Sequence, residues 1–219
     1  MSLKEFLTKI QDEVKVKEEI RQEVQKDMRS ATRLSKIAIL MVHQGNFEEA
    51  ENRLREAGEL FIKLCEISKD HSEFMYKGIV DSAFQEYAEA YTFLKLVKEN
   101  RFISFEDIGV PATSYVLGLA DVIGELRRRV LDLLRGGRIV EAEDCLELMD
   151  MIYIELTGMD DAYFMISGLR RKCDIARRII ETTRGDVTIE MRRRSLEDSI
   201  RELKKTLEEE VKVGEDKTE

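Results

Sequence analysis

The sequence predicts an all-α fold, a long antiparallel bundle of about seven helices. The chain of 219 residues contains a single proline, Pro111, so long helices can run without interruption. Strong helix formers, namely Glu, Lys, Arg, Leu and Ala, dominate the composition. Apolar residues recur at steps of three and four positions, and no segment shows the sustained alternation typical of a strand. Long helices with short connections favour antiparallel packing.

The first three helices are separated by short polar breaks. The first is predicted over residues 3–44, where apolar residues recur mostly at every fourth position, and Gly45-Asn46 ends it. The second is predicted over residues 47–68 and the third over residues 72–100, with a polar turn between them. A short irregular stretch over residues 102–111 leads to the second half of the chain.

Glycines mark the ends of the later helices. Pro111 stands just ahead of a fourth helix over residues 113–134, where its missing N–H is harmless. A fifth helix covers residues 139–156, and a sixth runs over residues 161–184 until Gly185-Asp186. A looser seventh helix carries a coiled-coil-like seam of Leu196, Ile200, Leu203, Leu207 and Val211. We therefore expect a helical bundle over 1–186, an extra C-terminal amphipathic helix over 187–212 and a charged tail over 213–219.

Composition excludes several classes of protein. Apolar residues make up 43% of the chain and charged residues 37%, which is too hydrophobic for disorder and too charged for a membrane protein. No apolar run approaches the roughly 20 residues that span a bilayer, and the N-terminus lacks a secretory signal. Three dispersed cysteines, Cys65, Cys145 and Cys173, indicate reduced thiols on apolar helix faces of a cytoplasmic protein.

Two helices each carry a pair of acidic residues in an apolar stretch. Glu86 and Glu89 are the only acids in residues 82–96, and they lie about one turn apart. Asp121 and Glu125 are the only charged residues in 114–126, and they also share a helix face. Gly118 and Gly124 lie on that second face. Such glycines leave space for a ligand or for a neighbouring helix.

Four converging carboxylates predict a metal site. They would raise one another's pKa values and oppose folding unless a cation neutralises them. The donor set is all oxygen, which suits Mg²⁺ or Mn²⁺ and argues against zinc. Two interpretations compete with this one. Same-face acidic pairs are also common on solvated helices, and the chain contains 45 acidic residues. A ferritin-like di-iron site would require Glu-x-x-His, which neither His43 nor His71 provides.

Four basic residues are candidates for phosphate contacts. Lys36 lies in an apolar run, Arg29 shares its face, and Arg128 shares the face of the second acidic pair. Lys77 lies on the third helix but points away from its acids, which makes it the weakest candidate. The two lysines could equally be snorkelling surface residues, and Arg128 could pair with Asp132 or Glu125. His43 is most simply a favourable charge at a helix C-terminus.

These same stretches resemble the translin family, and its translin-associated factor X branch more than translin itself. The matching segments are EEIRQEVQKDMRSATRLSKIAILMVHQGN, FQEYAEAYTFLKLVKENRFIS and, most specifically, YVLGLADVIGELRRRV. Their order and spacing fit from about residue 18 to residue 184, so the terminal helix lies outside the resemblance.

The resemblance implies an all-helical subunit that assembles into a hollow shell, often an octamer, with single-stranded or partly duplex RNA inside. It also implies a Mg²⁺-dependent endoribonuclease. The acidic motifs of the family fall on Glu86, Glu89, Asp121 and Glu125, a set that translin itself lacks. Lys36 is expected close to a bound phosphate. The net charge of −9 then predicts an acidic exterior with basic groups facing inward.

Our leading hypothesis is a metal-dependent endoribonuclease that works in the cavity of a homo-oligomer. The four carboxylates would hold Mg²⁺ or Mn²⁺, and Lys36 or Arg128 would offset charge in the transition state. Two alternatives remain. One is a non-catalytic protein that binds single-stranded nucleic acid, like translin alone. The other is a helical scaffold whose acids pair with arginines.

Overall fold

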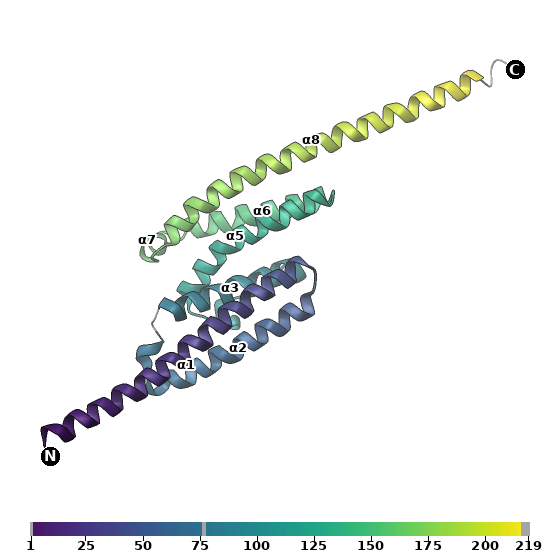
Figure 1. Ribbon diagram of the computed structural model, residues 1–219. Helices are drawn as coiled ribbons and strands as arrows, with labels where there is room; N and C mark the ends of the chain where they lie inside the picture. The colour runs from purple at the N-terminus through teal and green to yellow at the C-terminus, as the bar shows by residue number, and fades with distance from the viewer. Residues whose placement is uncertain (1, 76–77, 216–219) are drawn as a thin grey trace.

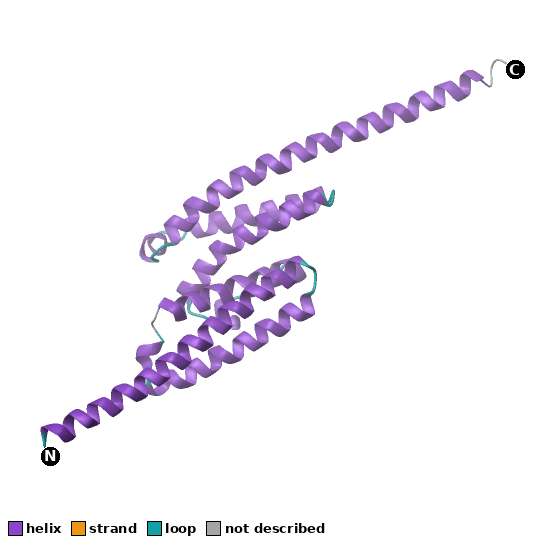
Figure 2. Ribbon diagram, in the orientation of Figure 1, coloured by secondary structure: helices purple, strands orange, loops and turns teal. Residues whose placement is uncertain are grey.

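The computed structural model describes residues 2–75 and 78–215, and this part of the chain consists of helices joined by short loops and turns, without strands. Its long helices are α1 (Leu3–His43), α2 (Phe47–Asp70), α3 (Gly78–Glu99), α5 (Ala112–Arg135), α6 (Ile139–Thr157) and α8 (Leu169–Glu215). Three short elements connect them: η1 (Ser72–Phe74), α4 (Phe105–Ile108) and α7 (Asp161–Met165). The predicted all-α fold is confirmed (Figure 2).

The helices form two groups of three that meet at one interface. Helices α1, α2 and α3 pack together, and α5, α6 and α8 form the second group (Figure 1). The groups join where α3 packs against α5. Large buried side chains fill both groups, among them Met28 and Phe93 in the first and Leu126 and Met149 in the second. The two predicted acidic pairs therefore lie on the two helices of the joining interface.

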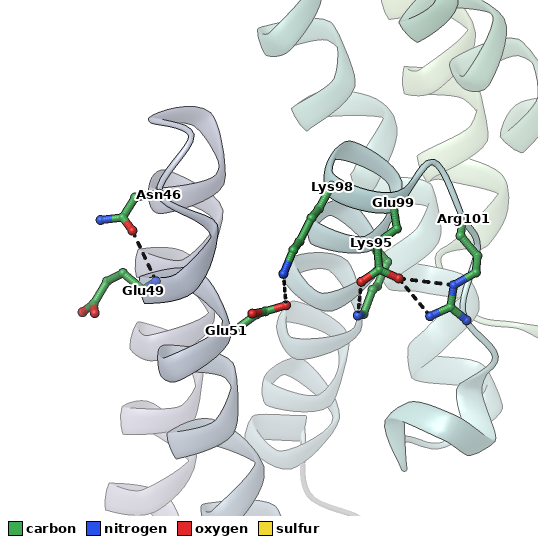
Figure 3. Close-up of polar contacts among 7 residues, drawn as sticks. All are labelled: Asn46, Glu49, Glu51, Lys95, Lys98, Glu99 and Arg101. Atoms are coloured by element: carbon green, nitrogen blue, oxygen red, sulfur yellow. Dashed lines mark hydrogen bonds and ion pairs between the residues drawn. The ribbon is translucent and has the colours of Figure 1, made fainter.

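Local sequence explains how the first group turns and holds together. Gly45 adopts a φ of +75° after α1, a conformation that favours glycine, and the Asn46 side chain accepts a hydrogen bond from the Glu49 backbone N–H at the start of α2. The Lys98 ammonium donates to Glu51 across α2 and α3 at 2.6 Å (Figure 3). This contact ties the C-terminal end of α3 to the first turns of α2.

The predicted third helix is shorter than expected, and the predicted sixth helix is divided. The third begins at Gly78, because Ser72–Phe74 forms a separate turn of 3-10 helix. The predicted sixth helix is divided into α7 and α8 at Gly168, which has a φ of +88°. The stretch over 102–111, predicted to be irregular, contains the single turn of α4.

The prediction that a helix ends at Gly185-Asp186 is wrong, because α8 continues through both residues to Glu215. A glycine inside a helix costs only about 1 kcal/mol relative to alanine, and tertiary contacts on both sides of Gly185 outweigh it. Arg127 of α5 donates to Thr183 at 2.7 Å and to Asp186 at 3.1 Å. Val187, 2% exposed, anchors the next turn. The helix also extends past residue 213, where the charged tail was predicted to begin.

The cysteines follow the prediction in part. Cys145 and Cys173 are buried in apolar packing as expected, whereas Cys65 is exposed on α2, so its predicted packing role is wrong. All three are free thiols. In the described ranges, no helix is long and apolar enough to cross a membrane.

Candidate functional site

The four predicted acidic residues come together where α3 packs on α5. Glu89 is the most buried of them, with 8% of its surface exposed. Burial raises its pKa to about 8, and the negative charges of Asp121, Glu86 and Glu125 contribute to the rise. The predicted convergence of the two pairs is therefore present in the structure. Near neutral pH it leaves Glu89 largely protonated.

Gly118 allows the two helices to approach closely beside this cluster. A Cβ atom at position 118 would lie 2.6 Å from the Gln85 carbonyl oxygen and 2.9 Å from the Glu89 backbone nitrogen. The space predicted at Gly118 is thus taken by a neighbouring helix. A Cβ atom at Gly124, by contrast, would meet no atom of another element within 4 Å, so this glycine faces open space.

A small cavity of about 230 Å³ lies beside Asp121 and Gly124. Lys172 and Arg171 of α8 line its other side. The carboxylate cluster is therefore bordered on this side by two positively charged side chains. Lys172 is the cation whose charge opposes the rise in the pKa of Glu89.

Three basic side chains of the chain pair with three of the four carboxylates. Lys172 Nζ lies 2.5 Å and 2.6 Å from the two carboxylate oxygens of Asp121. Lys36 Nζ, from α1, lies 3.2 Å from Glu86 Oε1. Each pair joins two helices, so α1 and α8 meet the carboxylates from opposite helical groups.

His43 makes the third pairing, at the end of α1. Its Nε2 lies 2.7 Å from Glu125 Oε2, and its side chain is 5% exposed. The ring packs against Phe93 with centroids 4.9 Å apart. The interpretation of His43 as a simple helix-terminal charge missed this contact with Glu125. On the α3 side, the Gln85 amide donates to Asp121 Oδ2 at 2.6 Å.

The predicted basic residues occupy different settings. Lys36 reaches the cluster. Arg29 lies seven residues earlier on the same face of α1 and is exposed. Arg128 is exposed on α5, and it has no ion pair with any residue in the described part of the chain, which removes the proposed pairing with Asp132 or Glu125. Lys77 lies outside the described residues.

The carboxylates do not form a ready-made cage for a metal ion. Within residues 2–75 and 78–215, no three or more Asp, Glu, His or Cys side chains are arranged so that they could hold one. Three of the carboxylates are turned to Lys36, His43 and Lys172 instead. The donor chemistry nevertheless fits a hard divalent cation, because the set is all oxygen and the mutual repulsion around Glu89 would fall on binding positive charge.

Comparison with known proteins gives a consistent relationship over most of the chain. The model of the Translin family matches residues 19–183. An uncharacterized protein of Methanocaldococcus jannaschii is 34% identical over 173 residues, which cover 78% of this chain and 76% of that protein. The family match ends before the second half of α8.

Two solved structures have similar folds. The crystal structure of apo-NeC3PO aligns with a TM-score of 0.76 and 27% identity, over 84% of this chain and 96% of that one. The structure of AfC3PO in complex with duplex RNA aligns with a TM-score of 0.74 and 33% identity, over 86% of this chain and 97% of that one. The family match and these relatives establish that this chain belongs to the translin family.

Proposed function

We propose that the protein is a metal-dependent endoribonuclease that cleaves single-stranded or partly duplex RNA inside a hollow homo-oligomer, with an octamer as the expected assembly. The observation that carries the proposal is the convergence of Glu86, Glu89, Asp121 and Glu125 around one buried carboxyl group. A cluster whose members oppose one another's ionisation is costly to fold, so it is better explained by function than by stability.

The four carboxylates would hold Mg²⁺ or Mn²⁺. Such an ion, when bound, supplies charge stabilisation at a phosphodiester and lowers the pKa of water. Glu89 must lose its proton to serve as a ligand. Lys36 and Lys172 already lie within ion-pair distance of the cluster, so each can donate to a phosphate oxygen placed there. His43 holds Glu125 in one orientation through Nε2.

An exposed basic stripe on α1 supports RNA as the substrate. Lys26, Arg29, Arg33 and Lys36 follow one another at steps of three, four and three residues, so they share a helix face, and all four are exposed or partly exposed. The stripe ends at Lys36, beside Glu86. A surface hollow of about 440 Å³ lies along its first part. A phosphate backbone lying on this stripe would lead directly to the carboxylates.

The relationship to AfC3PO, which has been crystallised with duplex RNA, supports the same class of ligand. A net charge of −9 is compatible with RNA binding if the basic stripe on α1 faces the interior of an assembly and the acidic surface faces outward. The three free thiols agree with a cytoplasmic site of action, which we include in the proposal.

Cleavage of a labelled single-stranded RNA tests the proposal. Wild-type protein should cleave this RNA in the presence of Mg²⁺ or Mn²⁺, and cleavage should stop in excess EDTA. Glu89→Gln should lose at least about 100-fold in rate, since a ligand of the catalytic ion is removed. Glu66→Gln, an exposed site on α2, is the matched control and should retain full activity.

Activity that persists in EDTA or in Glu89→Gln contradicts the proposal. Salt-dependent RNA binding without cleavage at any divalent ion concentration would instead identify a non-catalytic nucleic-acid-binding assembly protein. The native mass of the particle, measured in the same buffer, tests the octamer.

A further inference from the structure

The second half of α8 carries an apolar seam that no other described segment of the chain covers. Leu196, Ile200, Leu203 and Leu207 are 62%, 51%, 60% and 52% exposed. They follow one another at steps of four, three and four residues, the spacing of a coiled-coil seam. Figure 1 shows this part of α8 projecting beyond the helical bundle. It also lies outside the family match, which ends at residue 183.

The seam faces away from the bundle. Arg194 donates to the Gly137 carbonyl oxygen at 2.9 Å, and Asp198 and Glu202 line the hollow between α8 and the turn that joins α5 to α6. At about 100° per residue, these three residues lie on the side of α8 opposite Leu196 and Leu203. The described part of the bundle therefore lies on the opposite side of α8 and leaves the seam open to a second molecule.

We propose that the seam pairs antiparallel with the same seam of a second copy of this chain. In that arrangement Leu196 meets Leu207 of the second copy, and Ile200 meets Leu203 of the second copy. The residues that follow Leu196 and Leu203 then face each other between these layers. They are Glu197 and Lys204, which have opposite charges. The two-fold symmetry makes this ion pair twice.

The other flank of the seam is compatible with the same pairing. Ser199 and Thr206 precede the next apolar positions and would face each other across the two copies, so no like charges meet there. Ser199 also lines the hollow beside Gly137, so it stands between the seam and the side of α8 that faces the bundle. Glu197 accepts a hydrogen bond from Arg193 of its own helix, but both side chains are more than half exposed, and an exposed pair of this kind is easily exchanged.

Two other arrangements bring like charges together. A parallel pair would place Arg193 of both copies in the same layer, one step before Leu196. A second exposed apolar stripe with the same spacing lies at the start of α1 and is formed by Leu3, Leu7, Ile10 and Val14. Set antiparallel against the α8 seam, it would place Lys4 opposite Lys204. Of these three arrangements, antiparallel pairing of α8 with a second copy of α8 is the one that the charges favour.

The pairing does not require a new helix to form. The seam continues a helix that is already anchored in the bundle, so the cost of helix nucleation has been met. Four apolar positions on each copy amount to only two heptads. Such a short seam makes the contact weak by itself and effective between subunits or particles that are already held near each other.

Disulfide trapping in the full-length chain tests the geometry. In a Cys65→Ser background, which removes the exposed native thiol, the double variant Ser199→Cys/Thr206→Cys should form a covalent dimer under mild oxidation. Arg201→Cys/Glu208→Cys has the same spacing on another side of α8 and serves as the control. Cross-linking no greater than in the control would overturn the proposal.

Charge reversal tests the partner and its orientation. Measured by sedimentation, Glu197→Lys and Lys204→Glu should each weaken the contact about tenfold, and the double reversal should restore it. Failure of the double variant to restore the contact contradicts antiparallel self-pairing. Loss of the contact in Leu7→Glu would likewise overturn it, in favour of pairing with α1. None of these measurements depends on RNA or on nuclease activity.

Discussion

Lys172 on α8 forms an ion pair with both carboxylate oxygens of Asp121 on α5, at 2.5 Å and 2.6 Å. The two residues are 51 positions apart, and both are less than a third exposed. The contact brings a helix of the second group to the cluster that α3 and α5 create. It also places a positive charge of the chain itself close enough to Glu89 to oppose the rise in its pKa.

Replacing Lys172 should therefore affect both stability and the cluster. Lys172→Met leaves Asp121 partly buried without its cation, which should lower the free energy of unfolding by about 1–3 kcal/mol. Lys172→Arg keeps the positive charge, so its free energy of unfolding should fall by less than that of Lys172→Met. Urea unfolding at neutral pH without divalent ions measures the difference. An unchanged midpoint in Lys172→Met would show that the ion pair contributes nothing to folding.

The raised pKa of Glu89 predicts a pH dependence of stability without metal. Its pKa is 4.5 for a free glutamate and about 8 in the folded protein. Above pH 4.5 the unfolded chain releases this proton while the folded protein retains it. Stability is therefore fully present below about pH 4.5 and falls as pH rises toward about 8, by on the order of 3–5 kcal/mol. Glu89→Gln removes this dependence, so the difference in unfolding free energy between variant and wild type should grow from about pH 5 to about pH 8. A constant difference would contradict the raised pKa.

The two glycines of α5 make a matched pair of substitutions. Gly118→Ala places a methyl group 2.6 Å from the Gln85 carbonyl oxygen, which must push α3 and α5 apart and should cost about 1–3 kcal/mol. Gly124→Ala meets no atom of another element within 4 Å and removes a helix-destabilising glycine, so it should be neutral or stabilising by up to about 1 kcal/mol. Thermal unfolding compares them, and equal effects would refute the close helix contact at Gly118.

The basic stripe on α1 predicts a measurable salt dependence. Arg33→Ala should weaken RNA binding and reduce the slope of log affinity against log salt by about 1, because one phosphate contact is lost. Arg135→Ala at the far end of α5, with a side chain 86% exposed, should leave the slope unchanged. Fluorescence anisotropy at several salt concentrations gives both slopes. Equal slopes for Arg33→Ala and wild type would exclude the stripe from the RNA path.

Local patterns predict most of the fold, because helix periodicity and the breaks at Gly45 and Gly137 are properties of neighbouring residues. They fail at Gly185, where the helix continues because Arg127 of another helix donates hydrogen bonds to residues on both sides of the glycine. Sequence spacing alone does not reveal a tertiary contact of this kind, so the local pattern predicts a helix end where none exists.

The same distinction applies to the candidate site. Glu86 with Glu89, and Asp121 with Glu125, could be recognised because each pair lies within about one turn of a helix. His43 and Lys172 could not be assigned, because their partners lie 82 and 51 residues away. Lys172 also follows Arg170 and Arg171, and a run of three cations gives no indication of which one faces inward.

Binding of Mn²⁺ tests the central claim most directly, because it asks whether the four carboxylates hold a hard divalent cation together. Free Mn²⁺ can be followed by electron paramagnetic resonance during titration of the wild-type protein and of Glu89→Gln/Asp121→Asn. We predict saturable binding to the wild type, with at least about tenfold weaker affinity in the double variant. Equal binding by the two proteins, or no saturable binding by the wild type, would contradict the assignment of this cluster as a metal centre.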